Sequence, residues 1–374
     1  MERLKVWKEQ IPAWDEDAAC AARARWDAVA KPLGSLGKLE KMTANIAGMQ
    51  ADADVTISPA RLYVFCADNG IVSEGVTQTD ASVTAAVARS MASGRSSVSR
   101  MAQTAGIEVC PVDVGMLEEA QEPGILSCKI RRGTRNFLRE PAMTRDETLQ
   151  AIQVGYDLAA QAAAQGVRLL AGGEMGIGNT TTGAALAAVL LDLPVDKVCG
   201  RGAGLDDDAL RRKREVIEQG IDRYGLRAGN VRTGDEGPGD EGPEWTRDEV
   251  LRVLSRLGGL DIAALCGLFI GGASHRIPVL IDGMPCAVAA LTASMLIPGV
   301  SRYMLASHAG KEPAMPYLLE ALGLEPVVHA DLALGEGTGA VMLVPLLEMA
   351  LAVFRDAAQF SELGMEPYRR FDTK

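Results

Sequence analysis

The sequence predicts an α/β fold in which a parallel sheet lies between two layers of helices, as in three-layer, Rossmann-like domains. Short apolar runs of strand length recur along the 374-residue chain, and each one stops at a glycine or a polar group. Alanine- and leucine-rich stretches of helical length lie between these runs. Strands that alternate with helices are typical of a parallel sheet covered on both faces.

Five apolar runs are predicted to be strands: residues 62–66, 109–114, 167–171, 277–281 and 303–306. A further apolar run, 327–334, precedes the glycine-rich segment Leu-Gly-Glu-Gly-Thr-Gly at 334–339, where a strand would hand over to a helix. Because the carboxyl ends of parallel strands meet at one edge of a sheet, we expect the functional site at that edge.

Predicted helices fill the intervals. Residues 16–30 and 38–50 precede the first strand, and the later helices are residues 83–91, 182–191, 210–219, 262–270 and 341–354. We expect residues 1–58 and 351–374 to form a smaller helical domain and residues 59–350 to form an α/β catalytic domain. Residues 226–247 are predicted to be a flexible acidic insert, because Gly-Asp-Glu-Gly-Pro occurs at 234–238 and again at 239–243.

Composition excludes several classes of protein. The net charge of −11 and the isoelectric point near 5.0 argue against a nucleic-acid groove or an anionic membrane surface. The N-terminus has no apolar signal region, and no apolar stretch is expected to span a membrane, so we expect a cytoplasmic protein. The seven cysteines and three histidines lack metal-ligand spacing, so we expect buried free thiols and neither a metal nor a cofactor.

Residues 172–183, Gly-Gly-Glu-Met-Gly-Ile-Gly-Asn-Thr-Thr-Thr-Gly, follow a predicted strand and open a helix. Backbone N–H groups and hydroxyls at such a helix start can bind an anion such as phosphate. The segment lacks the lysine of an ATP-type phosphate loop. It also lacks the acid pair found in enzymes that use diphosphorylated ribose with Mg²⁺. A phosphate site and a simple capped helix both remain open from this motif.

A second glycine turn, residues 200–208, precedes a helix that contains Arg211, Arg212 and Lys213. It predicts either an aspartate-capped helix with a solvated basic face or a turn over a ribose phosphate with Lys213 as its counter-charge. Glu336, at the centre of segment 334–339, is either a solvated residue of a tight connection or a positioned general base. His308 is interpreted as a hydrogen-bonded structural residue.

Seven segments together resemble the nicotinate-nucleotide:dimethylbenzimidazole phosphoribosyltransferases, which activate the lower-ligand base of cobalamin. They are 31–37 (KPLGSLG), 67–70 (ADNG), 139–144 (REPAMT), 173–181 (GEMGIGNTT), 200–206 (GRGAGLD), 258–263 (GGLDIA) and 334–339 (LGEGTG). The resemblance implies a three-layer α/β domain, a small helical domain, a homodimer and Glu336 as the catalytic base. It further implies that the substrates lie against Asp68, Ala86, Glu174, Met175, Gly176, Gly178, Asn179, Thr180, Thr181, Gly202, Gly204 and Lys213.

The implied reaction moves the phosphoribosyl group of nicotinate mononucleotide to 5,6-dimethylbenzimidazole or a related base. Nicotinate leaves, and an α-ribazole 5′-phosphate type of nucleotide forms for cobamide assembly. The pyridine nitrogen of the substrate is positively charged, so nicotinate departs readily without Mg²⁺. A carboxylate that takes the proton of the attacking base would contribute roughly 10²–10⁴-fold to the rate.

Three departures from the family pattern surround the expected base pocket. The pocket glutamine is Ala86, an arginine before LGEGTG is Ala333, and GHRSAEPG reads SHAGKEPA at 307–314. We therefore hypothesise that the preferred base differs from 5,6-dimethylbenzimidazole. Two other functions remain open: a non-catalytic nucleotide-binding subunit of a phosphoribosyltransferase complex, and a hydrolase that splits nicotinate mononucleotide.

Overall fold

The computed structural model describes residues 2–119, 122–227 and 245–369, and its centre is a sheet of six parallel strands. The strand order is β3-β2-β1-β4-β5-β6. The strands are β1 (Ala60–Ala67), β2 (Ile107–Gly115), β3 (Leu126–Ser127), β4 (Leu169–Met175), β5 (Val279–Ile281) and β6 (Met304–Ala306). The predicted α/β class is confirmed, and β3 is a short edge strand that we did not predict.

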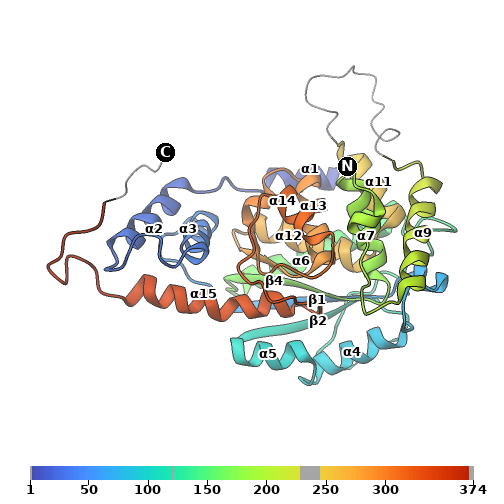
Figure 1. Cartoon of the computed structure of the whole chain (residues 1–374), viewed down its shortest axis with the longest axis horizontal. Coiled ribbons are helices and arrows are strands. Elements are labelled where there is room, and N and C mark those ends of the chain that lie inside the picture. The colour runs from blue at the N-terminus through green and yellow to red at the C-terminus, as the bar shows by residue number, and fades with distance from the viewer. Residues whose placement is uncertain (1, 120–121, 228–244, 370–374) are drawn as a thin grey trace, which may run out of the picture.

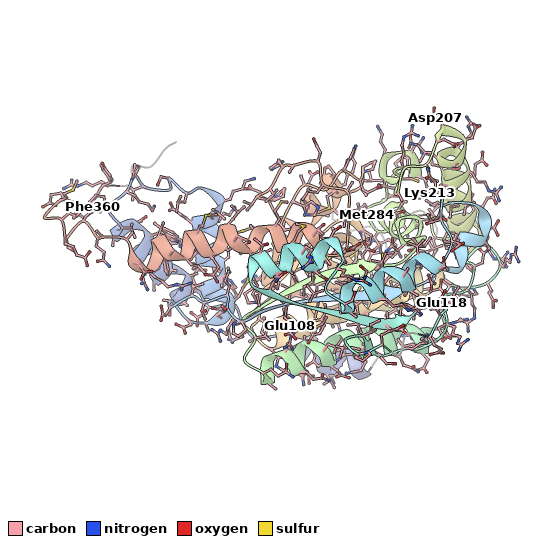
Figure 2. The ribbon with its side chains drawn as sticks, turned by 90° about the horizontal axis from the view of Figure 1, so that it is seen from below. Glu108, Glu118, Asp207, Lys213, Met284 and Phe360 are labelled. Carbon is pink, nitrogen blue, oxygen red and sulfur yellow. The ribbon has the colours of Figure 1, made fainter. Side chains whose placement is uncertain are left out.

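Helices cover both faces of the sheet (Figure 1). One face packs against α12 (Leu260–Ser274) and α13 (Met284–Leu296), and α6 (Arg145–Ala164) packs on the outside of α12. On the same side lie α7 (Asn179–Leu190), α8 (Val195–Val198), α9 (Asp207–Arg223), α11 (Arg247–Leu257) and α14 (Met315–Leu322). The opposite face packs against α4 (Ser82–Ala92), α5 (Ser97–Ala105) and α15 (Thr338–Asp356), which cross in front of the sheet in Figure 2.

The apolar core is densest where α12 lies between the sheet and α6. Nearly every residue of α12 is buried, which agrees with a helix that is apolar all round. Gly155 of α6 and Gly267 of α12 let the two backbones touch. A Cβ added to Gly155 would lie 1.9 Å from the Ala264 carbonyl oxygen, and one added to Gly267 would lie 1.8 Å from that of Ile152.

The helices at the left of Figure 1 belong to the N-terminal part of the chain: α2 (Glu16–Ala28) and α3 (Lys38–Gln50). The far end of α15 packs against them. The Trp26 and Phe354 rings are 5.1 Å apart, and the Arg25 guanidinium donates to the Phe354 carbonyl at 3.0 Å. The first helix, α1 (Glu2–Glu9), instead packs on α6 through Trp7 and Tyr156. The domain limits at residues 58 and 350 stay predictions.

Two of the predicted strands need correction. Residues 327–334 form no strand; only an isolated bridge joins Val328 to His308, because this segment follows the loop beyond β6 instead of joining the sheet. Strand β4 continues to Met175, four residues past the predicted end, so Glu174 lies within the strand. The glycines at 172 and 173 lie within β4, where an added Cβ would come within 2.8 Å of the Leu265 side chain and 2.9 Å of the Glu336 backbone.

Two further expectations concern the helices. By length and composition α15 could cross a membrane, contrary to the sequence-based expectation; 56% of its apolar window is buried inside the fold, as in the core helix of a globular domain. Within the predicted acidic insert, residues 228–244 lie outside the described part of the chain. The insert was predicted to reach residue 247, but α11 begins at Arg247 behind the helix cap Thr246.

Candidate active site

The turn between β4 and α7 is the first half of the site. Gly178 has φ +91°, and no side chain caps the start of α7 there. A Cβ at Gly176 would lie 2.4 Å from the Ala67 carbonyl oxygen, so only glycine allows the turn to pass this close to β1. The Ile177 N–H donates to the Thr84 hydroxyl at 3.2 Å, which ties the turn to α4. A glycine turn that leads into an uncapped helix suits an anion.

Lys213 of α9 supplies a positive charge beside this turn (Figure 2). Its side chain is 1% exposed, and its ammonium donates to the Thr180 hydroxyl at 2.9 Å and to the Gly200 carbonyl at 3.2 Å. A Cβ at Gly202 would lie 2.8 Å from the Thr180 hydroxyl oxygen. Three segments that are distant in sequence therefore meet here, as the resemblance implied. We call Thr180, Gly202 and Lys213, with the turn 176–178, the phosphate cradle.

The phosphate cradle encloses a cavity of about 80 Å³. Its predicted walls are Gly176, Gly178, Asn179, Thr180, Gly202 and Lys213. Residues 76–79 and Arg201 also line it, and sequence reasoning missed them. Gln78 donates to the Gly204 carbonyl, so Gly204 helps to hold the turn in place. Thr181 points away from the cavity: it is fully buried, and its hydroxyl has no hydrogen-bond partner among the described residues.

The Lys213 ammonium is held in a buried position. Burial lowers its pKa, while the nearby acidic groups of Cys199 and Glu312 raise that pKa in part. Glu312 also accepts a hydrogen bond from the Gly202 N–H at 3.0 Å, which fixes the second glycine turn. From the sequence, Glu312 stood out only as a member of the segment 307–314, without a role of its own.

Glu174 lies between the phosphate cradle and the Glu336 turn. Burial, and then the charge of Asp261, raise the pKa of Glu174 from 4.5 to about 8, so this carboxyl is protonated at neutral pH. The Asn179 amide donates both to the Glu174 carboxyl and to Asp261 Oδ2, the latter at 3.1 Å. Asp261 itself is fully buried at the start of α12, and burial raises its pKa to about 6. In the sequence Asp261 stood in segment 258–263, but no role was assigned to it.

Glu336 projects from a left-handed turn. Gly335, Glu336 and Gly337 have φ values of +85°, +60° and +85°. The Glu336 Oε2 atom is buried and has no hydrogen-bond partner among the described residues. Burial raises the pKa of this carboxyl, a hydrogen bond from the Val98 N–H lowers it in part, and the charge of Asp282 raises it. The raised pKa makes this partly buried carboxylate a stronger base than an exposed glutamate, and its free Oε2 atom can accept a proton.

The Glu336 turn touches β4 rather than the cavity wall. A Cβ at Gly173 would lie 2.9 Å from the Glu336 carbonyl carbon and oxygen, and one at Gly335 would lie 3.1 Å from Glu174 Oε1. Glu336 is not among the residues that line the 80 Å³ cavity. Its link to the phosphate cradle runs through Glu174 and Asn179, and Asn179 does line that cavity.

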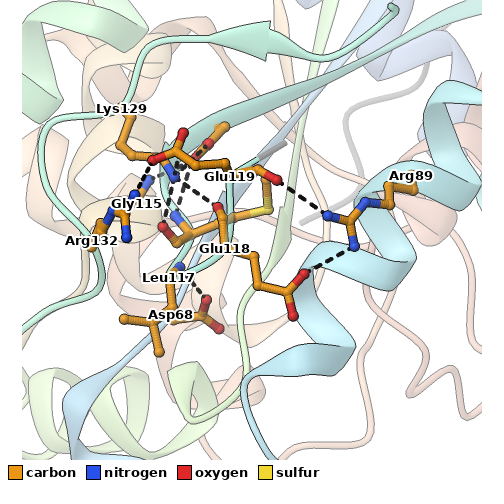
Figure 3. A network of polar contacts seen from close by, with 10 residues as sticks. Asp68, Arg89, Gly115, Leu117, Glu118, Glu119, Lys129 and Arg132 are labelled. Carbon is orange, nitrogen blue, oxygen red and sulfur yellow. Dashed lines mark hydrogen bonds and ion pairs between the residues drawn. The ribbon is translucent and has the colours of Figure 1, made fainter. Parts of the chain in front are cut away.

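Asp68 has a supporting position beside the site. It follows β1, is 2% exposed, and accepts from the Leu117 N–H at 2.8 Å (Figure 3). Burial raises the pKa of its carboxyl. The loop that Asp68 holds is also fixed by Lys129, which donates to the Met116 and Glu118 carbonyls at 2.9 and 2.8 Å. This network keeps the end of β2 beside the end of β1.

The remaining predicted site residues are Met175 and Ala86. Met175 ends β4 and is partly buried. Ala86 is exposed on α4 and is not among the residues that line the cradle cavity. On the same helix, Thr84 is buried and accepts the hydrogen bond from Ile177. Its serine- and threonine-rich surroundings at 82–84 were visible in the sequence, but the sequence did not indicate which hydroxyl faces the β4–α7 turn.

Among the described residues, no group of three or more His, Cys, Asp and Glu side chains is arranged to hold a metal ion. His308 is buried and packs against Gly339, with its Nδ1 atom 3.0 Å from the Ser307 hydroxyl. That environment agrees with the structural role expected from the sequence.

Comparisons with known proteins identify the family of the chain. Residues 11–365 match the sequence profile of a family described as phosphoribosyltransferase. The chain is 38% identical to the nicotinate-nucleotide--dimethylbenzimidazole phosphoribosyltransferase of Acetivibrio thermocellus, over 92% of this chain and 93% of that protein. It is 39% identical to the protein of the same name from Pseudomonas putida, over 96% of this chain and 97% of that one.

A solved structure gives the same result. The crystal structure described as CobT from Thermus thermophilus has a TM-score of 0.83 and 36% sequence identity, covering 94% of this chain and 99% of that one. Similarity of this extent, in sequence and in fold, shows that the chain belongs to the nicotinate-nucleotide--dimethylbenzimidazole phosphoribosyltransferase family.

Proposed function

We propose that this protein transfers the phosphoribosyl group of nicotinate mononucleotide to a benzimidazole-type lower-ligand base. The products are nicotinate and an α-ribazole 5′-phosphate type of nucleotide for cobamide assembly, and the enzyme is a pentosyltransferase. Membership of the family supports this reaction. The observation that carries the proposal is the meeting of the phosphate cradle with two partly buried carboxyls, Glu174 and Glu336.

The phosphate of the substrate would lie in the phosphate cradle. Lys213 and the Thr180 hydroxyl, at a helix start without a side-chain cap, offer positive charge and a hydrogen bond to a phosphate dianion. In a chain with a net charge of −11, this local arrangement has to attract the anion. Fixing the phosphate also orients the ribose for attack, and orientation of this kind is worth several kcal/mol of the barrier, about 7 in favourable cases.

The reaction itself exchanges one C–N bond for another. A base nitrogen attacks the anomeric carbon of the ribose from the α face, and the bond to nicotinate breaks with its electron pair going to the pyridine ring. The other ring N–H of the base then loses its proton to the Glu336 carboxylate. The raised pKa of Glu336 makes it a stronger base than an exposed glutamate.

We further propose that the preferred base is not 5,6-dimethylbenzimidazole but another benzimidazole, a purine or a phenolic compound. Ala86, Ala333 and the altered segment 307–314 are the positions that support this proposal. A competition assay with an equimolar panel of bases tests it. Clear preference for 5,6-dimethylbenzimidazole would refute the proposal while leaving the transfer reaction intact.

We also propose that the enzyme is a cytoplasmic homodimer. All seven cysteines are free, and four of them are buried, as is usual in a reducing compartment; Cys20, contrary to the expected burial, is exposed. Sedimentation equilibrium tests the dimer. A mass equal to one chain at micromolar concentration would contradict it.

One experiment separates the proposed transferase from the two other functions. Nicotinate mononucleotide is offered with a panel of bases to the wild type and to Glu336→Gln, and the products are identified by mass spectrometry. We expect an α-ribosyl phosphate of a base from the wild type, and loss of turnover with retained nucleotide binding in the variant. Ribose 5-phosphate as the main product would indicate a hydrolase, and no product with any base would indicate a non-catalytic subunit.

A further inference from the structure

The turn that presents Glu336 is unusual in its backbone. Three successive residues, Gly335 to Gly337, are left-handed, and Glu336 is the one among them with a side chain. L-residues with a Cβ rarely adopt this conformation, so the surrounding structure has to hold Glu336 in it. At the start of α15 the cap residue is Gly337, which has no side chain to cap the helix, and Thr338 closes the turn by donating its hydroxyl to the Gly335 carbonyl at 2.8 Å.

A buried carboxylate from another strand provides that support. Asp282 directly follows β5 and is 1% exposed. Its Oδ2 atom accepts from the Gly337 N–H at 3.0 Å, and its Oδ1 atom accepts from the N–H groups of Gly339 and Ala340 at 2.8 and 3.2 Å. Asp282 therefore caps α15 from outside and binds the residue next to Glu336.

The turn is also enclosed on two sides. The Glu336 backbone lies against Gly173 of β4, as described above, and a Cβ added to Gly339 would lie 2.0 Å from His308 Nδ1. His308 Nδ1 lies 3.9 Å from Asp282 Oδ1. Strand β4, the end of β5 and the loop after β6 thus surround one carboxylate that makes three backbone hydrogen bonds.

We infer that Asp282 is a positioning residue for the reaction: it holds the left-handed turn so that Glu336 points at the proton of the incoming base. This inference rests on the proposed role of Glu336. Both carboxylate oxygens of Asp282 accept hydrogen bonds from backbone N–H groups of the turn and of α15. Asp282 therefore supports the turn and does not touch the reacting atoms. A family relative that has the catalytic glutamate but no aspartate at the position of Asp282 would have to hold the turn in another way.

The charge of Asp282 gives the inference a second readout. The charged and titratable groups that face the Glu336 turn are Glu174 of β4, Asp282 after β5 and His308 after β6, while α5 contributes the Val98 N–H. Asp282 raises the pKa of Glu336. A general base must be unprotonated, so activity falls as the pH drops through the pKa of Glu336. Removing the charge of Asp282 should move that fall to lower pH.

The test compares Asp282→Asn with Glu336→Gln, the double variant and Asp15→Asn. Asp15 caps α2 through the Ala18 N–H at 2.9 Å, far from the site, so its variant is the matched loss of an aspartate cap. For each protein we would measure kcat against pH, nucleotide affinity by calorimetry, and melting temperature. For Asp282→Asn we expect a loss in kcat of about 10²-fold, the size found when one positioned group is removed.

Three results support the inference together: nucleotide affinity within threefold of the wild type, an acid limb displaced to lower pH, and a double variant no slower than Glu336→Gln. Wild-type kcat in Asp282→Asn would overturn it, and so would a double variant that loses further activity. If Asp282→Asn unfolds, Asp282→Glu is measured instead, and an unchanged acid limb and kcat there would overturn the inference. If Glu336→Gln is fully active, Glu336 is not the general base, and the proposed function fails. That result is distinct from a failure of the role proposed for Asp282 alone.

Discussion

The Lys213 ammonium in α9 donates a 2.9 Å hydrogen bond to the Thr180 hydroxyl in the first turn of α7. The pair joins two helices that are separated by the glycine turn 200–204, and it places a buried charge beside an uncapped helix start. The ammonium donates to two neutral oxygens, the Thr180 hydroxyl and the Gly200 carbonyl, and the charge of Glu312 raises its pKa in part. An anionic ligand is the partner that this arrangement lacks.

Lys213→Met should weaken the binding of nicotinate mononucleotide. Methionine fills nearly the same volume but removes the charge, and a hydrogen bond to a charged group is worth about 1.5–3 kcal/mol, or roughly 10- to 100-fold in affinity. Initial rates at varied substrate concentrations would show a higher KM for the nucleotide and an unchanged KM for the base. The control is Arg211→Met on the same helix, whose side chain is exposed and pairs with Asp208. Equal effects of the two variants would contradict the prediction.

Glu174 should make the stability of the protein depend on pH. Its pKa is about 8 in the folded state and 4.5 when unperturbed, so between these values the unfolded chain releases a proton that the folded chain retains. Glu174 therefore lowers the free energy of unfolding progressively as the pH rises from about 4.5 to 8. Above that range its contribution is constant. Glu174→Gln removes it, so the stability of the variant relative to the wild type should increase from pH 5 to pH 8. Urea unfolding at both pH values measures this difference, and a difference that stays constant would contradict the assigned pKa.

Gly173→Ala should displace the proposed catalytic base, Glu336, although the added methyl group lies against the Glu336 main chain and not against a substrate. The added Cβ would lie 2.9 Å from the Glu336 main chain, so the turn or β4 has to shift. We expect a loss of about 1–3 kcal/mol in stability and a lower kcat. Gly310→Ala is the control, because its added Cβ would meet nothing closer than 3.5 Å. Thermal unfolding and steady-state rates test both variants, and wild-type behaviour of Gly173→Ala would show that the turn is not confined as described.

Ala86→Gln should shift the choice of base toward 5,6-dimethylbenzimidazole. The amide restores a side chain able to hydrogen-bond the acceptor, and one such bond contributes about 1 kcal/mol, or roughly fivefold in relative kcat/KM. The competition assay with the panel of bases measures the change. Ala86→Leu has a side chain of comparable bulk without the amide, so the same shift in both variants would mean that size, not hydrogen bonding, controls the preference.

Apolar runs bounded by glycine or polar residues were enough to predict the sheet. The run 62–66 lies inside β1 and the run 109–114 inside β2, because strands buried on both faces are continuously apolar. The same signal was misleading at 327–334, where alternating apolar residues cover a loop outside the sheet. Helix α6 was missed, although Thr144 and Glu147 form a capping box at its start.

For the site, the sequence indicated the groups that lie in glycine-rich turns, such as Thr180 and Glu336. It gave no role to Asp261, which stands in segment 258–263, or to Asp282, which directly follows the predicted strand 277–281. Each is a single acid in an otherwise apolar stretch, and its role depends on groups more than 50 residues away in the sequence, namely Asn179 for Asp261 and Gly337 for Asp282. Such pairs are created by tertiary packing and leave no local pattern.

The contact between Gly173 and the main chain of Glu336 has a consequence for how this protein can diversify. The geometry of the proton acceptor depends on peptide groups, on the absence of a side chain at Gly173 and on the Asp282 carboxylate, so side chains that touch none of these can be exchanged without displacing it. Ala86, which is exposed on α4, can change toward a new aromatic acceptor while the chemical step is inherited intact, whereas Thr84, His308 and Glu312 are tied to the turns of the site. One scaffold can in this way serve lineages that build different cobamides.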